Sequence, residues 1–244
     1  RSPVGAEDIG LKLKGINRAP VVDLETSMDE LDRSAFFGTP VITGWFGEGD
    51  DGELALLGRG GSDHTATSIA RLVDADKVIL WKDVDGVLPI NPRWGVQSSP
   101  IPYLGYSEAV ELARLDTPVL HPATVEPLRG IGIPLEIRDL RSIVKEQAAS
   151  IIGPDLIQTH KVKAIGCLPN VTRLTVNSSS LEVQSELLGR VLIDLAKENI
   201  ACWNLDTIPG QISLIVSQQD LEKANQIITN HFSAPSVSEY GVMY

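Results

Sequence analysis

The 244-residue sequence predicts an α/β fold, in which a larger first part of alternating strands and helices is followed by a smaller second module. Three observations predict it. Apolar segments of strand length alternate with longer segments that carry apolar residues at helical spacing. Gly and Pro mark the connections between these segments. The pattern loosens at Gly153-Pro154 and resumes with a different rhythm, which indicates a linker between two parts.

The first part is a series of strand–helix units, which favours a largely parallel sheet. Ser27 is of a type that caps a helix N-terminus, and Gly38 follows the end of that helix. The expected elements are a helix at 27–37, strands at 40–43 and 53–57 around a hairpin tip at 47–52, a helix at 62–74, a strand at 77–81, helices at 107–114 and 122–130, and a strand at 133–137. Residues 1–20 show no period that assigns them to an element.

The second part predicts a βαββα unit of the ferredoxin-like type. Its expected elements are strands at 161–168 and 171–176, a helix at 181–198, strands at 200–205 and 211–216, and a helix at 221–232. We therefore expect a first domain at 1–150, a linker at 151–160, a second domain at 161–232 and an exit segment at 233–244.

The composition argues against several classes of partner. The chain has 21 Lys and Arg against 32 Asp and Glu, and the formal net charge of −11 disfavours nucleic acid and anionic membrane surfaces. No run approaches the length of a membrane-spanning helix. Cys167 and Cys202, the two cysteines, give neither a disulfide framework nor a zinc-ligand spacing, so a reducing and cytoplasmic compartment is expected.

The Gly-rich turn Leu57–Asp63 is the most informative stretch of the sequence. Its glycines let backbone N–H groups turn toward a ligand, and Ser62 then begins a helix whose N-terminus favours anions. Arg59 adds a forked cation suited to a carboxylate or a phosphate. A Gly-Gly turn alone is more often structural, but Arg, two glycines, Ser and Asp in one strand-to-helix turn favour an anion site.

A second stretch, Trp81–Val87, delivers Asp83 and Asp85 at the end of an apolar strand, where open α/β sheets bind ligands. A solvated Asp-Gly turn is the structural alternative, and no third ligand supports a metal cage. Lys82 and Arg93 make anion binding the better use of this loop.

Other motifs are weaker or absent. A histidine that opens a helix, as His121 does, or lies in its first turn, as His64 does, is more often a structural residue than a ligand-binding one. The chain has no Gly-x-Ser-x-Gly elbow, Walker-type loop or Gly-x-Gly-x-x-Gly, which disfavours hydrolase, P-loop and Rossmann assignments.

Four motifs carry a family resemblance: Leu57–Ala66 (LGRGGSDHTA), Trp81–Arg93 (WKDVDGVLPINPR), Val119–Thr124 (VLHPAT) and Thr43–Gly47 (TGWFG). In matching order, from about Val21 to Phe232, the chain resembles the aspartate kinases of the amino-acid-kinase superfamily. The resemblance implies a partial carbamate-kinase-like α/β/α sandwich followed by an ACT regulatory domain, which the βαββα unit resembles.

The resemblance implies ATP-dependent phosphorylation of the L-aspartate side chain to 4-phospho-L-aspartate, the first step toward lysine, threonine and methionine. Mg²⁺ would come with the nucleotide and not through ligands of the chain. Asp63 would be catalytic, and Trp45, Arg59 and Ser62 would bind aspartate. The implied nucleotide-binding residues are Lys82, Asp83, Leu88, Arg93, Pro118 and Val119. The implied effector residues are Asn177, Ser178, Leu181, Gln184, Leu187 and Cys202.

Several positions depart from the family pattern. The family usually has Thr at Lys82, Tyr at Leu88, Asp at Asn91 and Lys at Pro118. The change at Pro118 removes a cation expected beside the nucleotide, and Lys82 is a candidate replacement for it. The lysine-sensing form has Gly and Asp at the places of Glu186 and Trp203, so the effector stays unnamed. No counterpart of the family's N-terminal Lys-rich glycine loop is present. We therefore expect the nucleotide-side part of a kinase domain plus one ACT domain, inactive alone.

Two alternatives stay open at this point. One is another enzyme of the superfamily, such as a glutamate 5-kinase or a uridylate kinase, and the ACT-like module disfavours it. The other is a non-catalytic amino-acid-sensing protein with a degenerate kinase domain, or a module that serves only for dimerisation. The expected partners are ATP, L-aspartate, an amino-acid effector and a second copy of the chain bound through the ACT domain.

Overall fold

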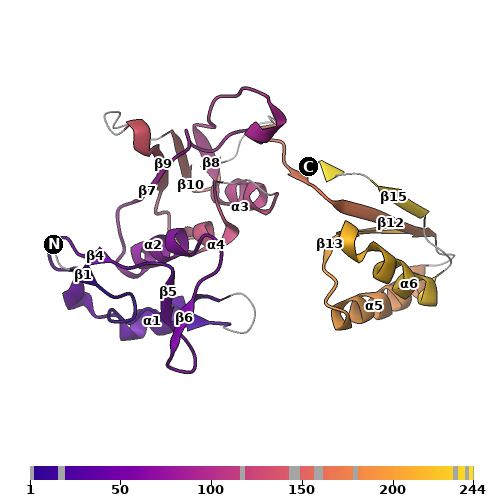
Figure 1. Cartoon of the computed structure of the whole chain (residues 1–244), viewed down its shortest axis with the longest axis horizontal. Helices are drawn as coiled ribbons and strands as arrows, with labels where there is room; N and C mark the ends of the chain where they lie inside the picture. Colours follow the sequence, from indigo (N-terminus) through magenta and orange to yellow (C-terminus); the bar gives the residue numbers. More distant parts are fainter. Residues whose placement is uncertain are drawn as a thin grey trace. The chain divides into compact units, whose positions relative to one another are not determined.

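The computed structural model describes residues 3–15, 20–115, 119–142, 149–156, 162–177, 181–232, 236–239 and 242–243. The chain forms two compact units, unit 1 at Arg1–Gly166 and unit 2 at Cys167–Tyr244 (Figure 1). Each unit has a hydrophobic core of its own.

Unit 1 is organised around a four-stranded sheet with the order β7-β9-β10-β8. The strands are β7 (Val78–Lys82), β8 (Tyr103–Gly105), β9 (Leu135–Asp139) and β10 (Ser150–Gly153). The sheet is mixed, because β7 is parallel to β9 and β10 is parallel to β8, whereas β9 and β10 are antiparallel. The largely parallel sheet expected from the sequence is therefore only partly present.

The remaining strands of unit 1 form small pairs. Strands β1 (Pro3–Val4) and β4 (Val41–Ile42) pair in parallel. Strands β2 (Leu13–Lys14) and β3 (Val21–Val22) are antiparallel, and β5 (Phe46–Glu48) and β6 (Leu54–Leu56) form an antiparallel hairpin. The helices are α1 (Leu24–Glu30), α2 (Gly61–Leu72), α3 (Tyr106–Arg114) and α4 (Pro122–Val125). Short 3-10 turns lie at Arg33–Phe36, Pro92–Trp94, Glu126–Leu128 and Leu140–Ser142.

Helix α2 lies between two hydrophobic cores of unit 1. On one side Ala70 packs into the core that fills the space beside β7 and β9, and on the other side Leu72 packs into the core of the N-terminal segments. Figure 1 shows α2 between the four-stranded sheet and the β5–β6 hairpin. A helix buried on two sides has little freedom to move, so its N-terminus is a fixed point in unit 1.

Unit 2 is a four-stranded antiparallel sheet with the order β13-β14-β12-β15, and helices α5 and α6 join its core. Its elements are β11 (Cys167–Leu168), β12 (Val171–Asn177), α5 (Leu181–Lys197), β13 (Cys202–Ile208), β14 (Gln211–Ser217), a 3-10 turn at Gln218–Asp220, α6 (Leu221–His231), β15 (Ser236–Glu239) and β16 (Val242–Met243). This order and connectivity are ferredoxin-like.

The expected boundaries differ from the structure at both ends of the linker. Residues 151–160 were expected to connect two domains, but β10 occupies Ser150–Gly153 and pairs with strands on both sides. Ser150 and Ile152 are fully buried, because β10 is an inner strand of the sheet. The expected exit segment at 233–244 contains β15, which pairs with β12, and β16, which pairs with β11. Unit 2 therefore includes a fourth sheet strand.

Three further expectations are wrong locally. Ser27 lies inside α1 and is buried, because Asp23 is the N-cap residue and the Ser27 hydroxyl accepts a hydrogen bond from the Lys12 N–H. The helix does not run to Phe37 but is interrupted before a 3-10 turn. The strand expected at 161–168 is reduced to β11 among the described residues. Within the described part of the chain, no helix has the length and apolarity needed to cross a membrane.

Candidate active site

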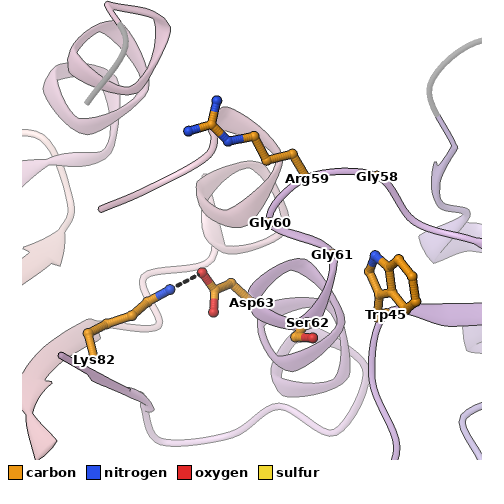
Figure 2. Close-up of a pocket in the computed structure, with 8 residues that line it drawn as sticks. All are labelled: Trp45, Gly58, Arg59, Gly60, Gly61, Ser62, Asp63 and Lys82. Carbon is orange, nitrogen blue, oxygen red and sulfur yellow. Dashed lines mark hydrogen bonds and ion pairs between the residues drawn. The ribbon is translucent and has the colours of Figure 1, made fainter. Parts of the chain in front are cut away.

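A Gly-rich bend at residues 58–61 connects β6 to the start of α2. Gly60 is the N-cap residue and has φ +75°, a left-handed conformation that glycine adopts without strain. The Gly61 N–H donates to the Gly58 carbonyl (3.0 Å), which closes a tight turn. The bend and the first turn of α2 line a cavity of about 590 Å³. The cavity is lined by Trp45, Gly58, Arg59, Gly60, Gly61, Ser62, Asp63 and Lys82 (Figure 2).

The bend is held between two side chains, which explains why glycine is needed twice. A Cβ atom at Gly60 would lie 2.6 Å from the Cβ of His121, and one at Gly61 would lie 2.5 Å from Cδ1 of Trp45. Both distances are too short for a real contact. His121 is itself the N-cap of α4, where its Nδ1 accepts from the Ala123 N–H (3.3 Å). His121 is thus a structural residue that supports the bend.

An ion pair crosses the cavity from β7 to α2. Lys82, the last residue of β7, donates through Nζ to Oδ2 of Asp63 in the first turn of α2. Both side chains are only partly exposed, at 24% and 20%. The sequence predicted both residues in the site but not their contact, because they lie 19 positions apart and on different elements. The carboxylate thus fixes an ammonium group at the edge of the cavity.

Arg59 and Ser62 are exposed on either side of the helix start. Figure 2 shows Arg59 extending from the bend, Lys82 reaching to Asp63, and Trp45 on the other side of the α2 start. Burial lowers the pKa of His121, and the nearby positive charge of Arg59 lowers it further. The Arg59 guanidinium therefore lies beside the N-terminus of a helix, an arrangement that binds anions.

Trp45 is held in an unusual backbone conformation. Its φ is +80°, which is rare for a bulky residue. Its N–H donates to Oγ1 of Thr65 on α2 (3.1 Å), and its carbonyl accepts from the Leu57 N–H (2.8 Å). The side chain is 48% exposed and forms one wall of the cavity. Sequence reasoning did not single out Thr65, and its only signal was its place one turn into a helix that follows the Gly-rich bend.

The buried His64 connects the same helix to the N-terminal segments. Its Nε2 accepts a hydrogen bond from the Val22 N–H in β3 (3.0 Å), so the ring is neutral with its proton on Nδ1. Burial lowers the pKa of His64. The structural role that the sequence predicts for His64 agrees with this contact.

The expected nucleotide residues beyond Lys82 do not line the cavity. Asp83 and Arg93 are exposed and Leu88 is half-buried in the loop after β7. Val119 is buried in the unit 1 core, so its side chain is not available to a ligand, and Pro118 lies outside the described residues.

The loop after β7 is anchored by two contacts. The Val87 N–H donates to Oγ of Ser150 (2.9 Å), and a Cβ at Gly86 would lie 2.7 Å from that oxygen. Arg141 forms ion pairs with Asp85 (3.2 Å) and Asp139 (2.9 Å), and its hydrogen bonds lower the pKa of Asp139 to about 2. Charged groups therefore gather where parallel β7 and β9 end.

The expected effector residues do not all share one end of unit 2. Asn177 pairs with Gln211 at one end of β14, whereas Cys202 pairs with Val216 at the other. Five residues of β-strand separate these positions by roughly 17 Å. Cys202 therefore does not join the others, because its register places it at the opposite end of the sheet. Ser178 lies outside the described residues, as do the side chains of Leu181 and Gln184. Leu187 is half-buried on α5.

The described residues contain no group of three or more His, Cys, Asp or Glu side chains placed to hold a metal ion.

Comparison with known proteins gives a consistent family. Residues 5–139 match the Amino acid kinase family. Aspartokinase 2 of Bacillus subtilis is 32% identical over 204 residues, which cover 82% of this chain and 47% of that protein. The chloroplastic Aspartokinase 1 of Arabidopsis thaliana is 30% identical over 206 residues, covering 75% and 35% respectively. The chain spans less than half the length of these two relatives.

Solved structures show the same fold. Aspartate kinase of Clostridium acetobutylicum superposes with a TM-score of 0.79 at 21% identity, over 99% of this chain and 55% of that one. Escherichia coli aspartokinase III, solved in complex with aspartate and ADP, gives a TM-score of 0.75 at 21% identity, over 100% and 57%.

Proposed function

The chain belongs to the amino acid kinase family, and from this we propose that it supplies the nucleotide-side part of an aspartate kinase. The enzyme transfers the γ-phosphoryl group of ATP to the side-chain carboxylate of L-aspartate and forms 4-phospho-L-aspartate, a first step toward lysine, threonine and methionine. The observation that carries the proposal is the cavity in which the Gly-rich bend, the α2 N-terminus, Arg59 and the Lys82–Asp63 pair meet. The relatives named aspartokinase support the choice of substrate.

The chemistry needs positioning and charge stabilisation more than proton transfer. A carboxylate is already ionised near neutral pH, so its oxygen attacks the γ-phosphorus without a general base, and the bond from that phosphorus to the bridging oxygen breaks to release ADP. The difficulty is to hold two anions in line. The backbone N–H groups of Gly60 and Ser62 and the dipole of α2 supply fixed positive potential where negative charge develops.

Each side chain then has a part that follows from its position. Arg59 binds the α-carboxylate of aspartate, because a guanidinium offers a two-pronged contact to a carboxylate. Trp45 is a wall of the aspartate pocket, and Ser62 donates to the reacting end. Asp63 is the catalytic residue that organises this end by holding the ammonium of Lys82 beside the transferred group.

The nucleotide lies beside the loop that follows β7. Lys82, Asp83, Leu88 and Arg93 border it, Val119 contributes through its backbone, and Pro118 is kept as a proposed nucleotide residue. Mg²⁺ would come with the phosphates and would neutralise part of their charge. Of the chain's own cations, Lys82 acts on the transferred group, whereas Arg59 holds the aspartate.

Unit 2 is proposed to be an ACT regulatory domain. The end of the sheet that carries Asn177 and the start of α5 is the effector site, with Ser178, Leu181, Gln184 and Leu187. Strand β13 is at the edge of the sheet and exposes Trp203 (54%) and Ile208 (51%). An exposed edge strand with apolar side chains is suited to pairing with a second chain, so we assign the homodimer contact to β13.

Phosphoryl transfer by the protein expressed from its complete reading frame tests the proposal. Acyl phosphate is trapped with hydroxylamine while ADP release is followed in parallel, with L-aspartate, L-glutamate and UMP as acceptors. Equal amounts of hydroxamate and ADP with aspartate alone are expected. Transfer to another acceptor, or amino-acid binding without turnover, would contradict the proposal.

A further inference from the structure

The backbone of Trp45 is strained at a place where it forms a wall of the cavity. A φ of +80° costs a bulky residue free energy, and such conformations persist only where surrounding contacts enforce them. The indole lies against the bare backbone of Gly61, so its position depends on the left-handed conformation being kept.

Thr65 is the residue that enforces this conformation. Its hydroxyl accepts the Trp45 N–H (3.1 Å) and donates to the Gly61 carbonyl (2.9 Å). Thr65 is 2% exposed, so its hydroxyl keeps these two partners and does not exchange them for water. One hydroxyl thus connects the strained residue to the Gly-rich bend, and the indole, the bend and the α2 start keep one fixed spacing.

We propose that Thr65 is a positioning residue that sets the depth of the amino-acid pocket by locking Trp45, and thereby favours aspartate over the longer glutamate. This rests on the proposed function. Without the hydroxyl, the Trp45 N–H has no acceptor, the backbone relaxes toward negative φ, and the indole leaves Gly61. The pocket then admits one more methylene.

A matched pair of variants separates this role from a general effect on the helix. Thr65→Val keeps the shape of the side chain and removes both hydrogen bonds. Thr67→Val is the control, because Thr67 is also fully buried on α2 and, within the described part of the chain, its hydroxyl bonds to the helix carbonyls of Asp63 and His64 alone. Thr65→Ser restores the hydroxyl.

The first readout is steady-state kinetics on the protein from the complete reading frame. For Thr65→Val we expect the aspartate KM to rise about five- to tenfold with a smaller change in kcat, and the preference for aspartate over glutamate to fall by about tenfold. Thr65→Ser should recover most of the preference, and Thr67→Val should keep it. An unchanged preference in Thr65→Val, or an equal loss in Thr67→Val, would overturn the proposal.

The second readout does not depend on catalysis. The indole N–H resonance of Trp45, assigned by its loss in Trp45→Phe, should move in Thr65→Val and return in Thr65→Ser. If it moves in this way while the wild-type protein phosphorylates no amino acid, the proposed function has failed and the locking contact stands. If it does not move, the locking contact is wrong whatever the activity.

Discussion

Two cations and one carboxylate surround the start of α2, and they differ in what holds them. Asp63 restrains Lys82, whereas Arg59 is exposed and forms no ion pair within the described part of the chain. A restrained ammonium suits a reacting group whose position is fixed, and an exposed guanidinium suits a substrate that arrives from solvent. The two cations therefore act at different stages, Arg59 in binding and Lys82 in transfer.

Replacing Arg59 by Ala should weaken the binding of aspartate far more than the binding of ATP. Loss of a charged hydrogen-bond pair is worth about 1.5–3 kcal/mol, so the aspartate KM should rise by roughly ten- to a hundredfold. Initial rates at varied aspartate and varied ATP measure both constants. Arg71→Ala, at the far end of α2, is the control. Equal losses for both substrates would count against the assignment.

Replacing Lys82 by Met should lower kcat by about a hundredfold, because one preorganised charge at the reacting group is lost. Lys82→Arg should recover part of the rate. Lys77→Met is the matched control, since Lys77 precedes the same strand and pairs with Glu136 instead (3.0 Å). An unchanged kcat in Lys82→Met would show that Lys82 takes no part in phosphoryl transfer.

Some residues of the site could be predicted from the sequence and others could not. The residues around the Gly-rich bend were found because a local pattern carries the chemistry: glycines, a helix start and a forked cation lie within seven positions. The Lys82–Asp63 pair and the Thr65–Trp45 contact join residues about 20 positions apart on different elements, so no local pattern contains them. The burial of the Val119 side chain was not predicted either, because it depends on tertiary packing.

At the scale of elements, α2 connects the site to both cores of unit 1. Its first turn lines the cavity and also carries the buried His64, and its end packs into the N-terminal core. A change in stability of the N-terminal segments is therefore transmitted to the helix that forms the site.

Unit 1 should lose stability as the pH falls below about 6.5, the ordinary pKa of histidine. Burial lowers the pKa of His64, so below that pH the unfolded chain binds more protons than the folded one, and the folded state is destabilised. The contribution of neutral His64 to the stability of the folded state is fully present above the ordinary pKa of histidine. It is lost as the pH falls toward the lowered pKa that His64 has in the folded state. Protonation of Nε2 also breaks the bond from Val22.

Thermal unfolding between pH 5 and 8 measures this effect. The pH dependence of the wild-type midpoint should be reduced in His64→Gln, whose amide oxygen accepts the Val22 N–H without titrating. If the variant and the wild type show the same slope, His64 does not contribute to the loss.

Elements with a long and regular pattern could be predicted, and short ones could not. Strands β12 and β14 and helices α2, α5 and α6 lie where apolar periodicity placed them. Strands β8 and β10 were missed, because a few residues give no period and their state is set by the neighbouring strands. The N-terminal 20 residues contain fully buried Ile9 and Leu11, yet their short elements show no regular spacing.

At the scale of the molecule, the units separate at Gly166, beyond the expected linker. A chain ending at Gly166 should therefore unfold cooperatively, whereas one ending at Ile151 lacks the rest of an inner strand, including the fully buried Ile152. Loss of a buried residue of this size costs about 2–5 kcal/mol. Denaturant unfolding followed by circular dichroism compares the two chains, and equal midpoints would contradict this boundary.

The most direct test of the anion-binding bend maps ligand contacts residue by residue. Backbone amide resonances of the protein from the complete reading frame are recorded before and after L-aspartate and Mg-ADP are added. The amides of Gly60, Gly61 and Ser62 should show the largest shifts, together with the indole of Trp45. Binding of both ligands with these signals unmoved would place the reaction elsewhere and contradict the account.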